Sequence, residues 1–371
     1  MEKSQSPSVL VAAGGTGGHL FPAVALAGVL NERGCAVHLA TDRRAIRFGD
    51  TFAEEAIHVV ASATIRSRNP VALTQTAAAL GIGLLEAWRL IGRLQPAAVI
   101  GFGGYPSVPP VLAAAWRGVP TVIHDANAVV GRANRLLAPR VTAIATTFPE
   151  TFRDAPNLAA KATLTGNPVR SAVVAAAATP YSAPVEALRL LIFGGSQGAR
   201  VMADIVPAAI ARLEPGLRAL LRIVQQAREE DLARVREAYA RLSVAAEVAP
   251  FFSDLPARIA ASHLVVARSG ASTVAELAAI GRPSILVPLP HAIDQDQFAN
   301  AGVLDHAGGA LRLVQETFTP ERLAAEIAAL AGAPQRLPAM AAAAGSLGRL
   351  DAAARLADLV LRLVPAIQLV H

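Results

Sequence analysis

Cysteine, aromatic side chains and long uninterrupted apolar runs are all scarce in this sequence. The single cysteine, Cys35, excludes an intramolecular disulfide framework and fits a reducing compartment. Aromatic residues make up 4% of the chain and are not interleaved with basic ones, which argues against nucleic-acid binding by base stacking. The N-terminus has no signal-peptide pattern, and no run reaches the roughly 18 apolar residues of a membrane-spanning helix. These absences predict a soluble or peripheral membrane protein.

What the chain does contain is enough apolar material for more than one core. Its 371 residues exceed the roughly 250–300 over which a single hydrophobic core keeps growing. Hydrophobic residues reach 53%, and the net charge is +6. A basic chain attracts anions, so a phosphorylated ligand or an anionic membrane surface is the expected acidic partner, and nucleic acid is not.

Short β-branched runs alternate with longer amphipathic runs, as in parallel α/β sheets. The same order, a strand followed by a glycine-rich loop and a helix, occurs near residue 10 and again near residue 190. We therefore predict an α/β fold with two Rossmann-like domains facing across a cleft. The expected boundaries are 1–167 and 168–344, with a C-terminal helix at about 345–371 packing back on the first domain. Ligands of such folds bind at the carboxyl ends of the strands.

Three strand-to-helix turns are rich in glycine, at 14–19, 101–105 and 194–198. Glycine lets backbone N–H groups approach a phosphate closely, and the helix that follows adds a favourable field. Tight turns need glycine for their own sake, so one such loop is weak support for phosphate binding, but three in matching topology favour it. None fits the dinucleotide fingerprint or the P-loop, which disfavours a dehydrogenase and a P-loop enzyme.

Five motifs, taken together and in order, resemble those of the MurG family of UDP-sugar glycosyltransferases. They are Gly14-Gly15-Thr16-Gly17-Gly18-His19, Gly103-Gly104-Tyr105-Pro106-Ser107, Thr165-Gly166-Asn167-Pro168-Val169-Arg170, Gly194-Gly195-Ser196-Gln197-Gly198-Ala199-Arg200 and Arg268-Ser269-Gly270-Ala271-Ser272-Thr273-Val274-Ala275-Glu276. The resemblance implies a GT-B-type, inverting, metal-independent transferase with no cofactor. It also implies that the partners are UDP-N-acetylglucosamine and a lipid-linked muramyl-pentapeptide acceptor, at the cytoplasmic face of the bacterial inner membrane.

The resemblance also assigns site residues. The catalytic candidates are His19 and Asp125. The donor-binding candidates are Thr16, Gly17, Gly18, Asn127, Arg170, Ser196, Gln197, Phe252, Ala271, Ser272, Thr273, Glu276 and Gln297. The acceptor-binding candidates are Gly14, Gly15, Gly103, Gly104 and Tyr105. In this scheme Arg170 neutralises part of the diphosphate charge, Glu276 accepts from the ribose hydroxyls, and the Phe252 backbone meets the uracil.

His19 is the strongest single candidate for the base. An inverting transfer needs a group that takes the proton of the attacking hydroxyl, and imidazole titrates near neutrality. The alternative is a structural histidine that caps the loop.

The sequence departs from the family at two places. It has Asp125-Ala126 where the family has Glu-Gln, which shortens one carboxylate and removes one amide. It also has Asp296 where the family has histidine before Gln297. Asp294 and Asp296 form a D-x-D triplet, a pattern that holds a divalent metal in another transferase fold. Because arginine and the glycine loops already supply neutralisation, we expect a polar loop and no metal site.

The segment 66–93 is the candidate for membrane contact. It carries Arg66, Arg68, Arg89 and Arg93 among leucine, isoleucine and tryptophan residues, a pattern typical of helices that lie on an anionic bilayer. An ordinary helix that buries its apolar face is the alternative. For the function as a whole, three alternatives stay open: a transferase with another acceptor, a UDP-sugar epimerase, and a non-catalytic UDP-sugar-binding protein.

Overall fold

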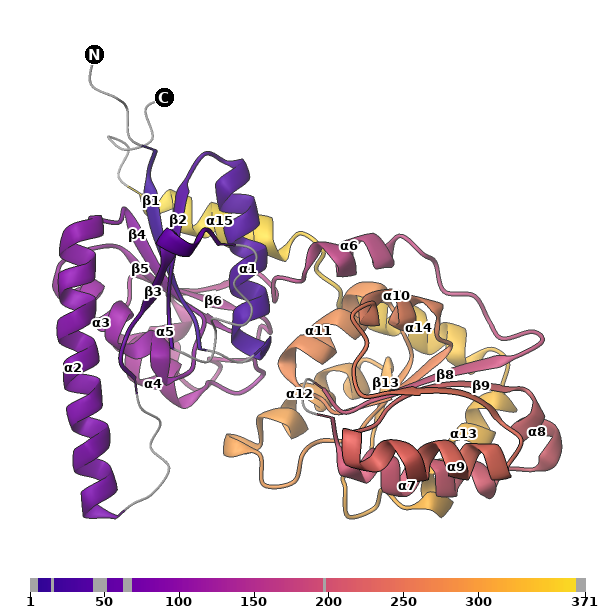
Figure 1. Cartoon of the computed structure of the whole chain (residues 1–371). Coiled ribbons are helices and arrows are strands. Elements are labelled where there is room, and N and C mark those ends of the chain that lie inside the picture. The colour runs from indigo at the N-terminus through magenta and orange to yellow at the C-terminus, as the bar shows by residue number, and fades with distance from the viewer. Residues whose placement is uncertain (1–5, 15–16, 43–51, 63–68, 196–197, 365–371) are drawn as a thin grey trace. The chain divides into compact units, whose positions relative to one another are not determined.

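The computed structural model describes residues 6–14, 17–42, 52–62, 69–195 and 198–364. The chain forms two compact units (Figure 1). Unit 1 consists of Met1–Arg170 and Asp351–His371, and unit 2 consists of Ser171–Leu350. Each unit is built on one parallel sheet, which confirms the predicted fold class of two Rossmann-like α/β units.

The sheet of unit 1 has the strand order β3-β2-β1-β4-β5-β6-β7, and its neighbouring strands pair in parallel. The strands are β1 (Ser8–Ala12), β2 (Ala36–Thr41), β3 (Ile57–Val59), β4 (Ala98–Gly101), β5 (Thr121–Asp125), β6 (Ala143–Thr146) and β7 (Ala162–Leu164). The order reverses between β1 and β4, so the loops after these two strands open at the point where doubly wound sheets bind ligands.

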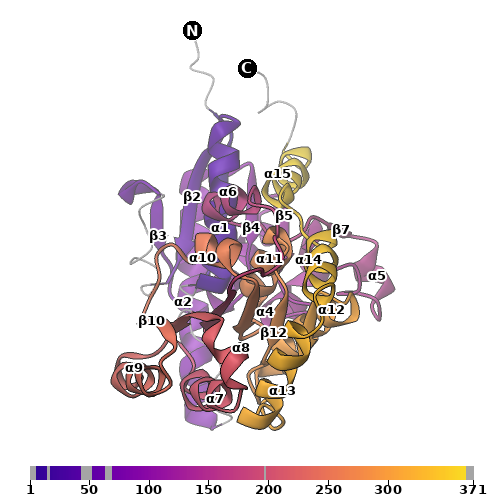
Figure 2. The same cartoon turned by 90° about the vertical axis from the view of Figure 1, so that its right-hand side faces the viewer.

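Helices cover both faces of this sheet (Figures 1 and 2). They are α1 (Gly17–Glu32), α2 (Pro70–Leu94), α3 (Val108–Trp116), α4 (Arg132–Leu137), α5 (Pro156–Ala159) and α15 (Ala352–Arg362), with 3₁₀ turns at Glu54–Ala56, Tyr105–Ser107 and Ala138–Arg140. Because side chains alternate along a strand, Val9 and Val11 pack in the cluster with α1 and α15. Leu10 and Ala12 pack in the opposite cluster, with α2 and α3.

The sheet of unit 2 has the parallel order β10-β9-β8-β11-β12-β13. Its strands are β8 (Leu188–Phe193), β9 (Leu221–Gln226), β10 (Ala245–Ala249), β11 (Leu264–Ala267), β12 (Ser284–Leu286) and β13 (Ala310–Arg312). Its helices are α6 (Ser171–Ala177), α7 (Arg200–Ala211), α8 (Pro215–Ala219), α9 (Leu232–Arg241), α10 (Leu255–Ala261), α11 (Ala271–Ile280), α12 (Asp296–His306), α13 (Pro320–Ala331) and α14 (Arg336–Ser346). Two 3₁₀ turns lie at Glu229–Asp231 and Ile293–Gln295.

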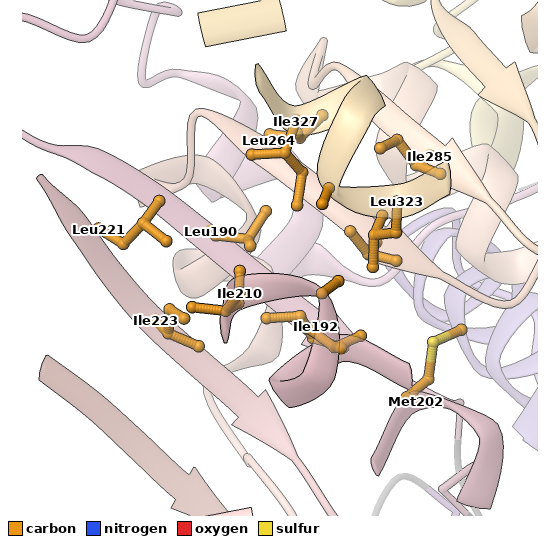
Figure 3. Packing of buried hydrophobic residues seen from close by; sticks show 14 of the residues in the cluster. Leu190, Ile192, Met202, Ile210, Leu221, Ile223, Leu264, Ile285, Leu323 and Ile327 are labelled. Carbon is orange, nitrogen blue, oxygen red and sulfur yellow. The ribbon is translucent and has the colours of Figure 1, made fainter. Parts of the chain in front are cut away.

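The main core of unit 2 lies between the sheet and helices α7 and α13 (Figure 3). Leu190 and Ile192 of β8 meet Ile210 of α7 and Leu323 of α13 in this cluster, all at 1% exposure or less. Full burial of each such side chain is worth about 1.5–3 kcal/mol. This core fixes the central strands, and the loops that follow those strands are fixed at the same edge of the sheet.

A buried arginine ties three helix ends of unit 2 together. Arg282 is 1% exposed and donates to the carbonyl oxygens of Thr179, Ala260 and Ile280 at 2.9, 2.7 and 2.8 Å. These carbonyls lie at or just beyond the C-termini of α6, α10 and α11, where a cation satisfies groups that the helices leave open.

Nowhere in the described part of the chain is a helix both long enough and apolar enough to cross a membrane.

Candidate functional site

The predicted site residues of each unit lie where its strands end. In unit 1, Gly14 follows β1, Gly103 follows β4 and Asp125 ends β5. In unit 2, the glycine loop follows β8 and Ala271 opens the helix after β11. The carboxyl edge of a parallel sheet is where such folds bind ligands, so both edges are candidate surfaces.

His19 lies in the first turn of α1, against the backbone of Gly103 and Gly104. A methyl group added at Gly103 would lie 3.4 Å from His19 Cε1, and one added at Gly104 would lie 3.4 Å from Cδ2. Both glycines have a left-handed backbone, with φ of +83° and +72°. The positive φ values favour glycine at both positions, and a side chain at either one would lie in van der Waals contact with the imidazole.

Burial affects the charge of both histidines in this region. It lowers the pKa of His19 below its usual 6.5, although a hydrogen bond to the Phe102 backbone opposes the shift. It also lowers the pKa of the fully buried His124, to about 4, and His124 Nε2 donates to the carbonyl of Gly166 at 3.0 Å. The low pKa of His19 leaves its imidazole neutral at pH 7, as a general base must be.

Asp125 organises the loop that follows β5. Its carboxylate accepts from the backbone N–H of Asn127 at 3.1 Å, from the N–H of Gly131 at 3.0 Å and from the Asn134 amide at 3.1 Å. Burial raises the pKa of Asp125 to about 6, and the three hydrogen bonds and Arg135 oppose the rise. Asp125 thus fixes the backbone of Asn127, a predicted sugar contact.

Arg170 lies against the start of α1. Its guanidinium carbon is 4.5 Å from the centre of the Phe21 ring, a cation–π contact. Phe21 in turn packs closely on Gly17, where an added methyl group would lie 3.0 Å from its ring. The predicted phosphate-binding cation is therefore placed beside a helix N-terminus, which itself favours anions.

Gly17 and Gly18 begin this helix, and Tyr105 begins the 3₁₀ turn after Gly104. Gly15 and Thr16 lie outside the described residues.

In unit 2 the described ends of the glycine loop are held by neighbouring strands. The N–H of Gly194 donates to Gln226 Oε1 at 3.0 Å, and Gln226 Nε2 donates to the Pro250 carbonyl at 3.2 Å. Phe252, which follows β10, is 7% exposed and lies under the guanidinium of Arg258 at 4.3 Å. Gln226 thus links the strand ends next to the expected uracil site. Ser196 and Gln197 lie outside the described residues.

The predicted ribose and phosphate contacts cluster at the start of α11. Ala271, Ser272 and Thr273 form its first turn, and its N-cap is Gly270, which has no side chain to cap the helix. The first-turn N–H groups are thus left for a ligand. Glu276 lies one turn further on and is 6% exposed.

The predicted sugar-contact loop before α12 is fixed and strained. Ser269 Oγ donates to the Gln297 carbonyl at 2.8 Å, and Gln297 Oε1 accepts from the Leu289 N–H at 3.0 Å. Three non-glycine residues of this loop have a left-handed backbone, namely His291, Asp294 and Gln295 with φ of 57°, 58° and 52°. Such strain persists only where the surroundings hold it, and it is concentrated at functional sites.

Several residues that support the site were not predicted from the sequence. Asn134 and Gln226 hold the loops described above, and Arg268 donates to the carbonyls of Val287 and Pro288 at 3.1 and 2.9 Å. Arg268 stands in a recognised motif, so a signal was present. No pattern in the sequence pointed to Asn134.

Within the described ranges, no group of three or more histidine, cysteine, aspartate or glutamate residues could hold a metal ion. A groove of about 490 Å³ between α7 and α9 contains none of the predicted residues.

Comparison with known proteins gives a consistent result. Residues 9–146 match the glycosyltransferase family 28 N-terminal domain, and residues 189–357 match the family 28 C-terminal domain. The chain is 62% identical over 362 residues to a UDP-N-acetylglucosamine--N-acetylmuramyl-(pentapeptide) pyrophosphoryl-undecaprenol N-acetylglucosamine transferase from Rhodopseudomonas palustris (strain BisB18), covering 97% of this chain and 96% of the relative. A relative of the same name from Bradyrhizobium sp. (strain ORS 278) is 63% identical, with 96% and 98% covered.

Solved structures agree. The crystal structure of Acinetobacter baumannii MurG matches with a TM-score of 0.79 at 30% identity, covering 96% of this chain and 99% of that one. A UDP-GlcNAc 2-epimerase from Neisseria meningitidis has a TM-score of 0.66 at 14% identity, covering 96% of this chain and 100% of that one. The second likeness shows a shared fold alone.

Proposed function

The chain belongs to the MurG family of glycosyltransferase family 28, and we propose that it transfers N-acetylglucosamine from UDP-N-acetylglucosamine to a lipid-linked acceptor. The acceptor is the 4-hydroxyl of undecaprenyl-pyrophosphoryl-N-acetylmuramyl-pentapeptide, and the transfer inverts the anomeric carbon without a metal. The observation that carries this proposal is the near-full-length identity of 62–63% to transferases of that name.

The proposed chemistry centres on His19. The acceptor hydroxyl attacks the anomeric carbon from the face opposite UDP, its proton passes to the neutral imidazole, and the bond from that carbon to the diphosphate oxygen breaks. The Gly103–Gly104 backbone keeps the His19 ring in place. The lowered pKa of His19 keeps the imidazole unprotonated. A positioned base of this kind contributes about 10²- to 10⁴-fold in rate.

Unit 2 is the proposed donor domain. The first turn of α11 and the glycine loop after β8 supply N–H groups to the diphosphate. Glu276 accepts from the ribose hydroxyls, and Gln297 contacts the sugar. Unit 1 is the proposed acceptor domain, in which Asp125 acts by positioning Asn127 and does not itself touch the reacting atoms.

Unit 1 also carries the proposed membrane contact. Ile82, Leu85 and Trp88 of α2 and Trp116 of α3 are 56%, 50%, 37% and 57% exposed, and we call these four residues the apolar patch. The guanidinium of Arg117 lies 4.2 Å from the Trp88 ring.

Exposed Arg89 and Arg93 stand on α2 as well, so cations accompany the apolar side chains. Apolar side chains beside arginines suit an anionic bilayer, and we propose that this surface brings unit 1 to the lipid-linked acceptor. Arg66 and Arg68, which were part of the sequence prediction, lie outside the described residues.

The test is transfer of radiolabelled N-acetylglucosamine to a short-chain lipid-linked muramyl acceptor, with EDTA present and with His19→Ala in parallel. We expect EDTA-insensitive transfer that is lost in the variant while UDP binding persists. UDP-sugar binding without transfer would indicate a different acceptor or a binding protein. A changed sugar in the absence of acceptor would indicate an epimerase.

A further inference from the structure

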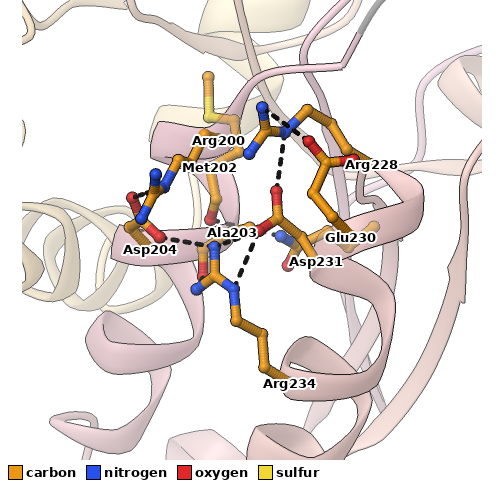
Figure 4. Close-up of polar contacts among 9 residues, drawn as sticks. Arg200, Met202, Ala203, Asp204, Arg228, Glu230, Asp231 and Arg234 are labelled. Carbon is orange, nitrogen blue, oxygen red and sulfur yellow. Dashed lines mark hydrogen bonds and ion pairs between the residues drawn. The ribbon is translucent and has the colours of Figure 1, made fainter.

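Charged side chains of alternating sign form a continuous chain beside the glycine loop of unit 2 (Figure 4). Arg200 pairs with Asp204 at 3.4 Å on α7, and Asp204 accepts from Arg234 of α9 at 2.6 Å. Arg234 also donates to Asp231 at 2.7 Å, and Asp231 accepts from Arg228 at 2.8 Å. We call these five residues the ion chain.

Both ends of the ion chain meet the glycine loop. Arg200 is the first residue of α7, two positions after Gly198. At the other end, the stem of Arg228 packs on Gly198 itself, because a methyl group added there would lie 2.9 Å from Arg228 Cγ. Gly198 has a φ of +69°, so the chain turns sharply at this contact before the helix begins. The ion chain therefore closes a ring that includes the end of the loop and the start of α7.

Asp231 is the most buried member of this ring. It is 4% exposed, and each of its carboxylate oxygens accepts from a different arginine, Oδ2 from Arg228 and Oδ1 from Arg234. Arg234 reaches α7 twice, through Asp204 and through the Ala203 carbonyl at 3.2 Å. A buried carboxylate with its hydrogen bonds made fixes its partners far better than an exposed pair does.

The charges of the ion chain and of one neighbouring residue cancel. Its three arginines, Arg200, Arg228 and Arg234, are balanced by Asp204, Asp231 and the neighbouring Glu230, which lies 3.0 Å from Arg228. The group therefore adds no net charge to the donor surface. A rigid loop binds its ligand more tightly than a flexible one, since less freedom is lost on binding.

We propose that the ion chain is a positioning device for the donor. It holds Gly198 and the N-terminus of α7 in the geometry that receives the diphosphate of the nucleotide sugar, with Asp231 and Arg228 as positioning residues. This inference rests on the proposed role of unit 2 in donor binding and names further residues that set donor affinity.

Three variants of the full chain test it. Asp231→Ala releases both arginines, and Arg228→Met keeps an apolar stem over Gly198 but removes the ion pair. Glu237→Ala is the matched control, because it removes a pair on α9 with Arg241, at 3.7 Å and with both partners exposed, that does not reach the loop. The measurements are UDP affinity by calorimetry, KM for the donor, KM for the acceptor, kcat and the unfolding temperature.

We expect Asp231→Ala to raise the Kd for UDP and the donor KM by about five- to tenfold, because preorganisation enters binding and not the chemical step. Arg228→Met should raise both by a smaller factor. kcat and the acceptor KM should stay within about twofold of the parent, as should every constant of Glu237→Ala.

Three results would overturn the inference. One is UDP affinity that stays within about twofold of the parent in folded Asp231→Ala and Arg228→Met. Another is an equal loss in Glu237→Ala, and the third is a fall in kcat without a change in donor affinity. If Asp231→Ala does not fold, the UDP affinity of Arg228→Met alone decides whether the inference holds. A parent that binds UDP but does not transfer sugar would refute the proposed activity and leave this test of UDP affinity in force.

Discussion

The side-chain amide of Asn134 donates to the carboxylate of Asp125 at 3.1 Å and to the carbonyl of His124 at 2.9 Å. One residue of α4 thus holds the last two residues of β5. Together with the backbone N–H groups of Asn127 and Gly131, it brings three donors to the Asp125 carboxylate.

The stability of unit 1 should depend on the protonation of Asp125. Its pKa in the folded protein, about 6, lies above the usual 3.8, so the folded state binds this proton more tightly than the unfolded chain. Stability from this group is therefore gained as the pH falls and lost as the pH rises through 6. We expect the free energy of unfolding of the parent, minus that of Asp125→Asn, to be about 1 kcal/mol larger near pH 5 than near pH 7.5.

Urea titrations followed by tryptophan fluorescence measure this difference, because both tryptophans, Trp88 and Trp116, lie in unit 1. Asp351→Asn, at an exposed ion pair with Arg355, is the control and should show no such change. A difference of the opposite sign would contradict the buried position of Asp125.

The lowered pKa of His19 should appear in the pH dependence of transfer. The base acts when it is neutral, so kcat/KM should rise with pH through a value below 6.5 and be level at neutrality. Initial rates at low acceptor concentration measure this profile. An acid limb centred at or above pH 7 would show that a different group acts as the base.

Replacing Gly104 should impair catalysis more than it impairs stability. Gly104 has φ of 72° and ψ of 156°, a region that is essentially restricted to glycine, so alanine there costs about 1–3 kcal/mol of stability. Relief of this backbone strain moves the loop against the His19 ring, which lies 3.4 Å from the added methyl group, and a displaced catalytic group loses rate, so we expect kcat to fall about 10- to 100-fold.

Gly118→Ala is the matched control for this variant. Gly118 has a φ of +73°, nearly that of Gly104, but nothing lies within 4 Å of the added methyl group. It should lose stability, because its φ is also positive, with kcat unchanged. Equal kcat values in the two variants would mean that the loop does not position His19.

The apolar patch should sense an anionic bilayer directly. Trp88 and Trp116 are the chain's two tryptophans and both belong to the patch, so its insertion should shift the fluorescence maximum to the blue. We expect this shift with phosphatidylglycerol vesicles, a weaker one with phosphatidylcholine vesicles, and its loss in Leu85→Glu.

Val185→Glu is the control, because Val185 is 92% exposed but lies in unit 2. It should bind vesicles as the parent does. Transfer to a soluble acceptor should be unchanged in Leu85→Glu. Vesicle binding that survives in Leu85→Glu would place the membrane contact elsewhere.

Strong local patterns made much of the fold predictable from the sequence. The strand near residue 190 was predicted from its mostly apolar run before a glycine-rich turn, and β8 occupies Leu188–Phe193. The short strands β3, β6, β7 and β13 were not predicted. Each has three or four residues, and their neighbours in the sheet place them.

Some site residues could likewise be predicted from the sequence and others could not. Gly103 and Gly104 were found because the backbone demands glycine there, and His19 because its chemistry is distinctive. Asn134 and Asp231 escaped notice, since their roles depend on contacts with residues that the fold brings together. The roles of the Asn134 amide on α4 and the Asp231 carboxylate before α9 cannot be recognised from the sequence, because their partners come from other parts of the chain.

Unit 1 draws its core from both ends of the chain. Leu356 and Val360 of α15 are fully buried in the cluster that contains Val9 and Leu26. During synthesis the strands of unit 1 leave the ribosome first, yet their core lacks these side chains until residues beyond 351 have emerged. Unit 2 is continuous and has all its residues by then. The nascent chain therefore completes its second unit before its first.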